Sequence, residues 1–136
     1  SYRHWNEDIE PVIYYEAEKF RNISVDLVIA KSLGTLIATK AYESYSFKTK
    51  RAVFIGNPLR RLIPEYVELL DHFANTVPIL FIQQTSDPKG SYRQLESITQ
   101  RYELCNTVEV SGNDHLYNNF DELKSIIKSW VNLSTT

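Results

Sequence analysis

Three residues that could together form an activated nucleophile each follow a short apolar run of the sequence: Ser32, Asp87 and His115. A serine hydroxyl is a weak nucleophile by itself, so it needs a base within hydrogen-bond reach and a third group that orients the base. His115 is the available base, and Asp87 is the available orienting acid. If the apolar runs are strands of one sheet, this order of residues predicts a Ser-His-Asp triad for acyl transfer.

The residues around Ser32 have the spacing of a sharp turn from a strand into a helix. Such a turn exposes its middle side chain, and it needs small residues two positions before and after, which Ala30 and Gly34 provide. The turn also places the serine at a helix N-terminus, where the backbone N–H of Leu33 is free to stabilise developing negative charge. We therefore predict that Leu33 supplies one oxyanion donor through its backbone.

Each of these signals has a simpler interpretation when it is taken alone. A small-x-Ser-x-Gly pattern also arises by chance, and a serine after a strand often only caps the helix. Asp87 before Pro88 is typical of a turn, and a histidine in a polar loop usually lies at the surface. The three signals together favour a site, because all of them fall where a strand is predicted to end.

The sequence alternates between strand-like and helix-like segments. Four apolar or β-branched runs cover residues 25–30, 52–56, 78–83 and 107–110, and they begin 26 to 29 residues apart. This spacing indicates strands buried on both faces of a parallel sheet, with a helix between each pair. In such a sheet, ligands bind outside the carboxyl ends of the strands.

Helical periodicity fills the segments around these runs. The clearest case is an apolar stripe within residues 123–131. Asn119 with Glu122, and Ser91 with Gln94, predict two capped helix starts. Three further helices are expected, at residues 9–20, 33–41 and 64–73.

The predicted fold class is α/β: a three-layer sandwich with a mainly parallel sheet, in a single domain over residues 1–136. A flavodoxin-like doubly wound fold is the alternative. It would need a phosphate cradle after the first strand, and Ser32 with Leu33 makes a poor one.

Three stretches of the sequence resemble the α/β-hydrolase superfamily, over a region from about residue 25 to the C-terminus. DLVIAKSLGTL resembles its nucleophile elbow, PILFIQQTSDP its acid-bearing strand and loop, and VEVSGNDH its last strand and histidine loop. The resemblance implies Ser32 as nucleophile, Asp87 as acid and His115 as base. It departs from the family at Ala30, where glycine is usual. The family's first strands, with the loop that gives the second oxyanion donor, have no counterpart, and residues 2–5 would be the tail of a preceding strand or its loop.

The resemblance implies a serine hydrolase that cleaves a small-molecule carboxylic ester or thioester through an acyl-serine intermediate. Two alternatives stay open. One is an acyltransferase, and the other is a catalytically degenerate binding or interaction module, with a partner or a second copy at an open sheet edge. Because the sequence begins at Ser1 and contains no methionine, we expect it to be a processed or truncated piece of a longer protein.

Composition argues against several other classes of protein. The 17 acidic and 15 basic residues give a net charge of −2 with no basic stripe, which predicts no nucleic-acid partner. No apolar run is long enough for a membrane span, and no signal-peptide pattern is present. The single cysteine favours a cytoplasmic location. Without a glycine-rich phosphate loop or metal-ligand spacing, we expect neither a cofactor nor a metal.

Other polar residues near the predicted site have ordinary interpretations. Lys31 is expected to be a solvated charge, and Asp114 is kept as a reserve for the orienting acid. Arg60 and Arg61 follow the second strand at the same sheet edge, where they could bind an anionic substrate, although surface charge is more common. Cys105 has no basic neighbours, so we expect a small, partly buried thiol.

Overall fold

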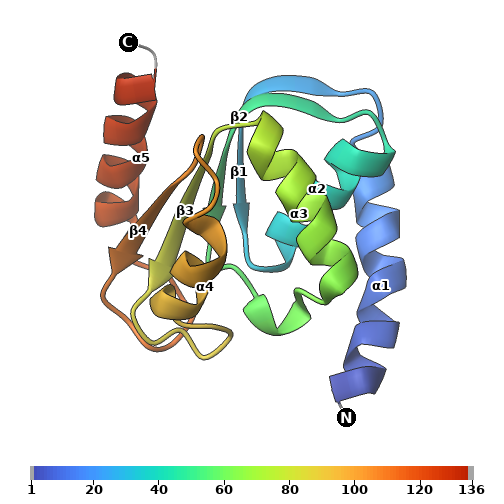
Figure 1. Ribbon diagram of the computed structural model, residues 1–136, viewed down its shortest axis with the longest axis horizontal. Coiled ribbons are helices and arrows are strands. Elements are labelled where there is room, and N and C mark those ends of the chain that lie inside the picture. The colour runs from blue at the N-terminus through green and yellow to red at the C-terminus, as the bar shows by residue number, and fades with distance from the viewer. Residues whose placement is uncertain (1, 135–136) are drawn as a thin grey trace.

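The structure, a computed structural model, describes residues 2–134 and has an α/β fold (Figure 1). In chain order, its elements are α1 (Tyr2–Glu18), β1 (Ser24–Lys31), α2 (Leu33–Ser44), β2 (Lys48–Ile55), the short 3₁₀ helix η1 (Leu59–Arg61), α3 (Pro64–Thr76), β3 (Ile79–Gln84), α4 (Tyr92–Thr99), β4 (Asn106–Val110) and α5 (Phe120–Ser134). The four strands pair in the order β1-β2-β3-β4, and all three pairings are parallel. The predicted class, with its parallel sheet, is therefore confirmed.

The side chains of the central strands alternate between two cores, one on each face of the sheet. On one face, Phe54 and Phe81 pack with buried residues of α2, α3 and α4. On the other face, Val53 and Ile82 pack with the apolar stripe of α5. Figure 1 shows this arrangement, with α5 on one side of the sheet and α1 packed against α2 on the outside of the other. Helices therefore cover both faces, as buried parallel strands require.

The predicted strands and helices are all present, and two of them begin well before their predicted starts. β2 begins at Lys48, four residues before the predicted start, because its first residues alternate in burial instead of forming an apolar run. α1 begins at Tyr2, so the expectation that residues 2–5 form the tail of a strand or a loop is wrong. The helix continues through Pro11 and extends upstream of its buried positions, Ile9 and Ile13.

The loops that leave the carboxyl ends of the strands gather at one end of the sheet, the lower end in Figure 1. These loops hold the residues singled out in the sequence. Within residues 2–134, no helix has both the length and the apolar character that a membrane span needs.

Candidate functional site

Ser32 occupies a single-residue turn between β1 and α2. Its backbone has φ 53° and ψ −122°, which is an unusual conformation for a residue with a side chain. Hydrogen bonds hold the turn on both sides: Ser32 N–H donates to Ile55 O at 2.9 Å, and the hydroxyl of Thr35 donates to Ser32 O at 2.8 Å. A methyl group on Gly34 would lie 3.6 Å from Ala30 Cβ, so strand and helix come close here but would still accept alanine.

The structure brings the three predicted site residues into one chain of hydrogen bonds. Ser32 Oγ lies 2.8 Å from His115 Nε2, and His115 Nδ1 lies 2.7 Å from Asp87 Oδ2. The side chain of His115 is 16% exposed and that of Asp87 is fully buried. Because a carboxylate only accepts hydrogen bonds, this geometry favours the tautomer with the proton on Nδ1, which leaves Nε2 as the acceptor that faces the serine.

The Asp87 carboxylate is held by two donors besides the histidine. The hydroxyl of Tyr117 donates to Oδ2 at 2.7 Å, and the backbone N–H of Lys89 donates to Oδ1 at 2.7 Å. Tyr117 Oη in turn accepts a hydrogen bond from Gln84 N–H at 2.6 Å. Both carboxylate oxygens are therefore tied to the protein at fixed points.

The loop that carries His115 is strained and tethered. Both His115 (φ 65°) and Tyr117 (φ 50°) have positive φ values, which cost about 1–3 kcal/mol each. The side chain of Gln84 supports this loop: its Oε1 accepts from the N–H groups of Asp114 and His115 at 3.1 and 2.9 Å. Its Nε2 donates to Asp114 Oδ1 at 3.0 Å.

Two neighbouring charges have structural partners in this loop. Lys31 is exposed, as expected of a solvated charge, and its Nζ also donates a hydrogen bond to Leu116 O in the histidine loop at 2.6 Å. Hydrogen bonds from the Leu116 N–H and then from Gln84 lower the pKa of Asp114. Since Asp114 binds Gln84 and its own loop while Asp87 binds the His115 ring, the reserve interpretation of Asp114 finds no support in this geometry.

The expected oxyanion donor lies beside the serine. Leu33 is the first residue of α2, so its N–H points out of the helix without an intrahelical partner. In the part of the chain that the structure describes, no hydrogen bond from this N–H is formed. Its position is compatible with binding negative charge next to Ser32 Oγ.

The two arginines predicted near the site are separated. Arg60, together with Lys89 and Asp87, lines an open pocket of about 780 Å³ beside the acid loop. Arg61 lines a different and much smaller pocket, which is also lined by Ile13 of α1. Only Arg60 is therefore placed where it could meet a ligand bound near the acid loop.

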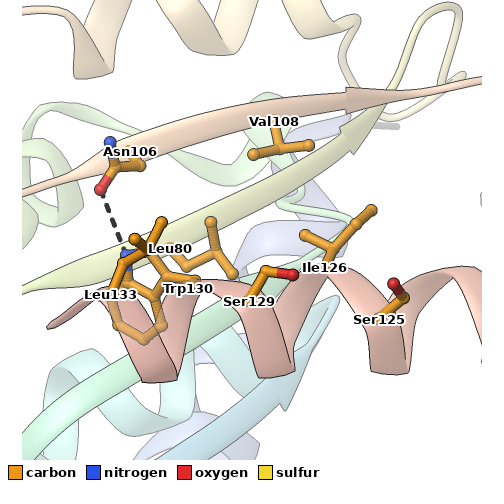
Figure 2. A pocket seen from close by; sticks show the side chains of 8 residues that line it. All are labelled: Leu80, Asn106, Val108, Ser125, Ile126, Ser129, Trp130 and Leu133. Carbon is orange, nitrogen blue, oxygen red and sulfur yellow. Dashed lines mark hydrogen bonds between the residues drawn. The ribbon is translucent and has the colours of Figure 1, made fainter. Parts of the chain in front are cut away.

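A second open groove, of about 610 Å³, lies on the face of the sheet that α5 covers (Figure 2). It runs between α5 and the first residues of β3 and β4, and Trp130 Nε1 donates across it to Asn106 Oδ1 at 3.2 Å. Its lining contains no residue of the Ser32, His115 and Asp87 chain. Among the described residues, no group of three or more His, Cys, Asp or Glu side chains could hold a metal ion.

Cys105 is a partly buried thiol, as expected. It donates to Ala74 O at 3.5 Å, and burial raises its pKa to about 11. At neutral pH this side chain is therefore a poor nucleophile.

The sequence interpretation missed three residues that build the site: Gln83, Gln84 and Tyr117. Gln83 is fully buried; its Oε1 accepts from Asn57 N–H at 2.7 Å and its Nε2 donates to Gly90 O at 2.7 Å, which joins the loops after β2 and β3. The available signal was two glutamines in succession at the end of an otherwise apolar strand, because buried amides must find hydrogen-bond partners.

No protein-family model matches this chain, and no curated protein matches it.

Proposed function

We propose that the chain is a serine hydrolase of the α/β-hydrolase type, which cleaves a carboxylic ester or thioester. One observation carries the proposal: the continuous hydrogen-bonded chain from Asp87 through His115 to Ser32, built from residues that follow three different strands. A chance cluster of polar side chains would not require a serine in a strained turn as well. The resemblance of the sequence to the α/β-hydrolase elbow, acid loop and histidine loop supports the same conclusion.

The reaction would begin with attack of Ser32 Oγ on the carbonyl carbon of the substrate. His115 Nε2 takes the hydroxyl proton as the new C–O bond forms, and Asp87 stabilises the resulting imidazolium. The tetrahedral intermediate collapses when His115 returns the proton to the departing alcohol or thiol. Water then attacks the acyl-serine by the same route, which releases the carboxylic acid and restores the Ser32 hydroxyl.

The negative charge of the intermediate needs donors that are already in place. The backbone N–H of Leu33 would provide one of them, because it is unpaired and next to the reacting oxygen. No cofactor is needed for any of these steps. If another hydroxyl or thiol replaced water as the acyl acceptor, the same groups would make an acyltransferase, and product analysis distinguishes the two.

A second candidate function rests on the edge of the sheet. Among the described strands, β1 pairs only with β2, and Ile29 on β1 is 55% exposed. An open, partly apolar edge can pair with another strand. A catalytically inactive module that binds a partner or a second copy of the chain at this edge therefore stays the alternative, and a cytoplasmic location stays a prediction.

A fluorophosphonate probe tests the proposed activity, because it reacts only with an activated serine. We expect intact-mass measurement to show one adduct on the wild-type protein and on Ser125→Ala, a matched control at an exposed serine of α5. We expect no adduct on Ser32→Ala. Equal labelling of wild type and Ser32→Ala, or no labelling of a folded wild type, would favour the binding module.

A further inference from the structure

Tyr117 belongs to the same hydrogen-bonded chain as the three predicted site residues, although it reacts with none of the proposed substrates. Its hydroxyl is a link between the backbone and the acid: Gln84 N–H donates to Tyr117 Oη, and Tyr117 Oη donates to Asp87 Oδ2. His115 Nδ1 binds that same oxygen. The tyrosine and the histidine therefore converge on one carboxylate oxygen.

The contact with this shared oxygen allows the tyrosine hydroxyl to fix the plane of the Asp87 carboxylate. The terminal torsion angle of an aspartate side chain has a broad distribution, so at least two fixed contacts are needed to hold the plane of the carboxylate. Lys89 N–H fixes Oδ1, and Tyr117 fixes Oδ2. Without the hydroxyl, His115 alone of these two side chains would bind Oδ2. The carboxylate could then rotate together with the imidazole ring and would no longer fix the orientation of that ring.

The tyrosine is also built to remain a donor. It is buried, and its burial together with the hydrogen bond to Asp87 raises its pKa well above the ordinary value. The phenol therefore keeps its proton at neutral pH. Gln84 N–H occupies an acceptor position of the oxygen and leaves its proton directed at Asp87.

The ring of Tyr117 makes a separate contribution. It packs edge to face against His115, with centroids 6.0 Å apart and planes at 82°. A Cβ on Gly56, which has φ +62°, would lie 2.7 Å from Tyr117 Cε2 and 3.2 Å from His115 Cε1. Glycine at the end of β2 therefore leaves the space that both rings occupy, and this packing does not depend on the hydroxyl.

We propose that Tyr117 is a positioning residue of this site, whose hydroxyl fixes the Asp87 carboxylate in the orientation that sets the tautomer and the direction of the His115 ring. The inference rests on the proposed function for its kinetic consequence. Its structural consequence, the state of the His115 ring, does not depend on any reaction.

Tyr117→Phe isolates the hydroxyl because it keeps the ring against His115 and Gly56. Tyr102→Phe is the matched control, since Tyr102 is also buried and its hydroxyl also donates to an aspartate, Asp71, in another part of the fold. Two quantities are measured on both variants below their thermal midpoints. They are the second-order rate constant of fluorophosphonate labelling and the ¹⁵N chemical shifts of the His115 ring, with His72 as internal reference.

We expect Tyr117→Phe to slow labelling by about tenfold, the usual worth of a hydrogen bond to a charged group, and to move the His115 ring shifts while those of His72 stay unchanged. Tyr102→Phe should leave the labelling rate and the His115 shifts at wild-type values. A Tyr117→Phe protein with wild-type labelling and unmoved His115 shifts would overturn the inference and leave the proposed function intact. If wild type is not labelled, the proposed function fails, and the His115 shifts alone decide the role of Tyr117.

A second substitution covers the case in which Tyr117→Phe does not fold. A fluorinated tyrosine placed at position 117 keeps the shape of the side chain and makes the phenol a stronger donor to Asp87. We expect the His115 ring shifts to move without loss of labelling. Unmoved shifts in this folded protein would also overturn the inference.

Discussion

Within the described residues, two tyrosines donate a hydrogen bond to an aspartate, and the two aspartates have different third partners. Tyr117 donates to Asp87 at the carboxyl end of the sheet, and Tyr102 donates to Asp71 between the end of α4 and α3. Both tyrosines are buried. The side chain of Asp87 is fully buried, whereas that of Asp71 is 38% exposed.

The third member of each network explains the difference in what they can do. Asp71 binds the guanidinium of Arg101 at 2.9 Å, and a guanidinium is a permanent donor that passes no proton onward. Asp87 binds a histidine, whose second ring nitrogen forms a hydrogen bond with the hydroxyl of Ser32. The same pair of residue types thus joins two secondary-structure elements in one place and binds the ring of a histidine in the other.

We expect the largest effect when the charge of Asp87 is removed, and almost none when the charge of Asp71 is removed. Asp87→Asn presents an amide where His115 Nδ1–H needs an acceptor, which favours the wrong tautomer and should slow fluorophosphonate labelling by about 10³- to 10⁴-fold. Asp71→Asn should leave labelling within about twofold of wild type, because its network does not reach Ser32. Labelling rates of the two folded variants measure the contrast directly.

This contrast can fail in two informative ways. If Asp71→Asn slows labelling as much as Asp87→Asn does, the effect is a general loss of structure, and the distinction between the networks is wrong. If Asp87→Asn labels at the wild-type rate, Asp87 does not orient the base. Circular dichroism of both variants shows whether each is folded when the rates are compared.

Gln84 gives a smaller effect, expected on both stability and labelling. Gln84→Ala removes the acceptor for the N–H groups of Asp114 and His115. The loop, in which two residues have a strained backbone with positive φ, then loses the contacts that hold it. Each unpaired group costs about 1–3 kcal/mol where it stays out of water, so we expect a loss of about 2 kcal/mol in the free energy of unfolding. Labelling should slow by about tenfold as His115 becomes less well placed.

Arg101→Ala is the counterpart of this substitution in the other network. Its ion pair with Asp71 is solvent-exposed, so the loss should stay below about 1 kcal/mol with no effect on labelling. Urea unfolding of both variants gives the comparison. A larger loss for Arg101→Ala than for Gln84→Ala would contradict the expectation that the hydrogen bonds of Gln84 stabilise the fold more than the exposed ion pair does.

Sequence reasoning reached the elements and the three principal side chains for a clear physical reason. Buried parallel strands are near-continuous apolar runs, and their carboxyl ends are adjacent in space, so the residues after each run are brought together by topology alone. Ser32, Asp87 and His115 could therefore be placed before any contact was known. The catalytic role of these residues stays a prediction until the labelling experiment is done.

The supporting residues could not be placed in the same way. Tyr117 and Gln84 act through side-chain hydrogen bonds that cross between loops, and neither spacing nor periodicity encodes such contacts. Tyr102 could not be placed either, since it lies beyond α4, which ends at Thr99. Tyr102 is nevertheless buried, because the turn after α4 packs against α3, where the hydroxyl of Tyr102 donates a hydrogen bond to Asp71.

The smallest expected effect is on the stability of the two tyrosine variants at alkaline pH. Burial, and then the hydrogen bond to Asp71, raises the pKa of Tyr102 to about 12, from 10.0 for an unfolded tyrosine. A raised folded pKa means that the stabilising contribution is fully present below pH 10 and is lost as the pH rises through 12. The difference in free energy of unfolding between wild type and Tyr102→Phe should therefore shrink between pH 10 and pH 12, as urea titrations at fixed pH would show.

The pair at the site should behave differently above this range of pH. The pKa of Tyr117 is raised further than that of Tyr102, because its burial is reinforced by Asp87 and Asp114. Each unfolded phenol ionises above pH 10 while the folded one keeps its proton, so the difference in stability between wild type and Tyr117→Phe should shrink between pH 10 and pH 12 as fast as that for Tyr102→Phe. Above pH 12 the Tyr102 difference should level off, whereas the Tyr117 difference should continue to shrink. If both differences level off at the same pH, the two phenols have the same acidity in the folded protein, and the surroundings of Tyr117 do not raise its pKa further than those of Tyr102.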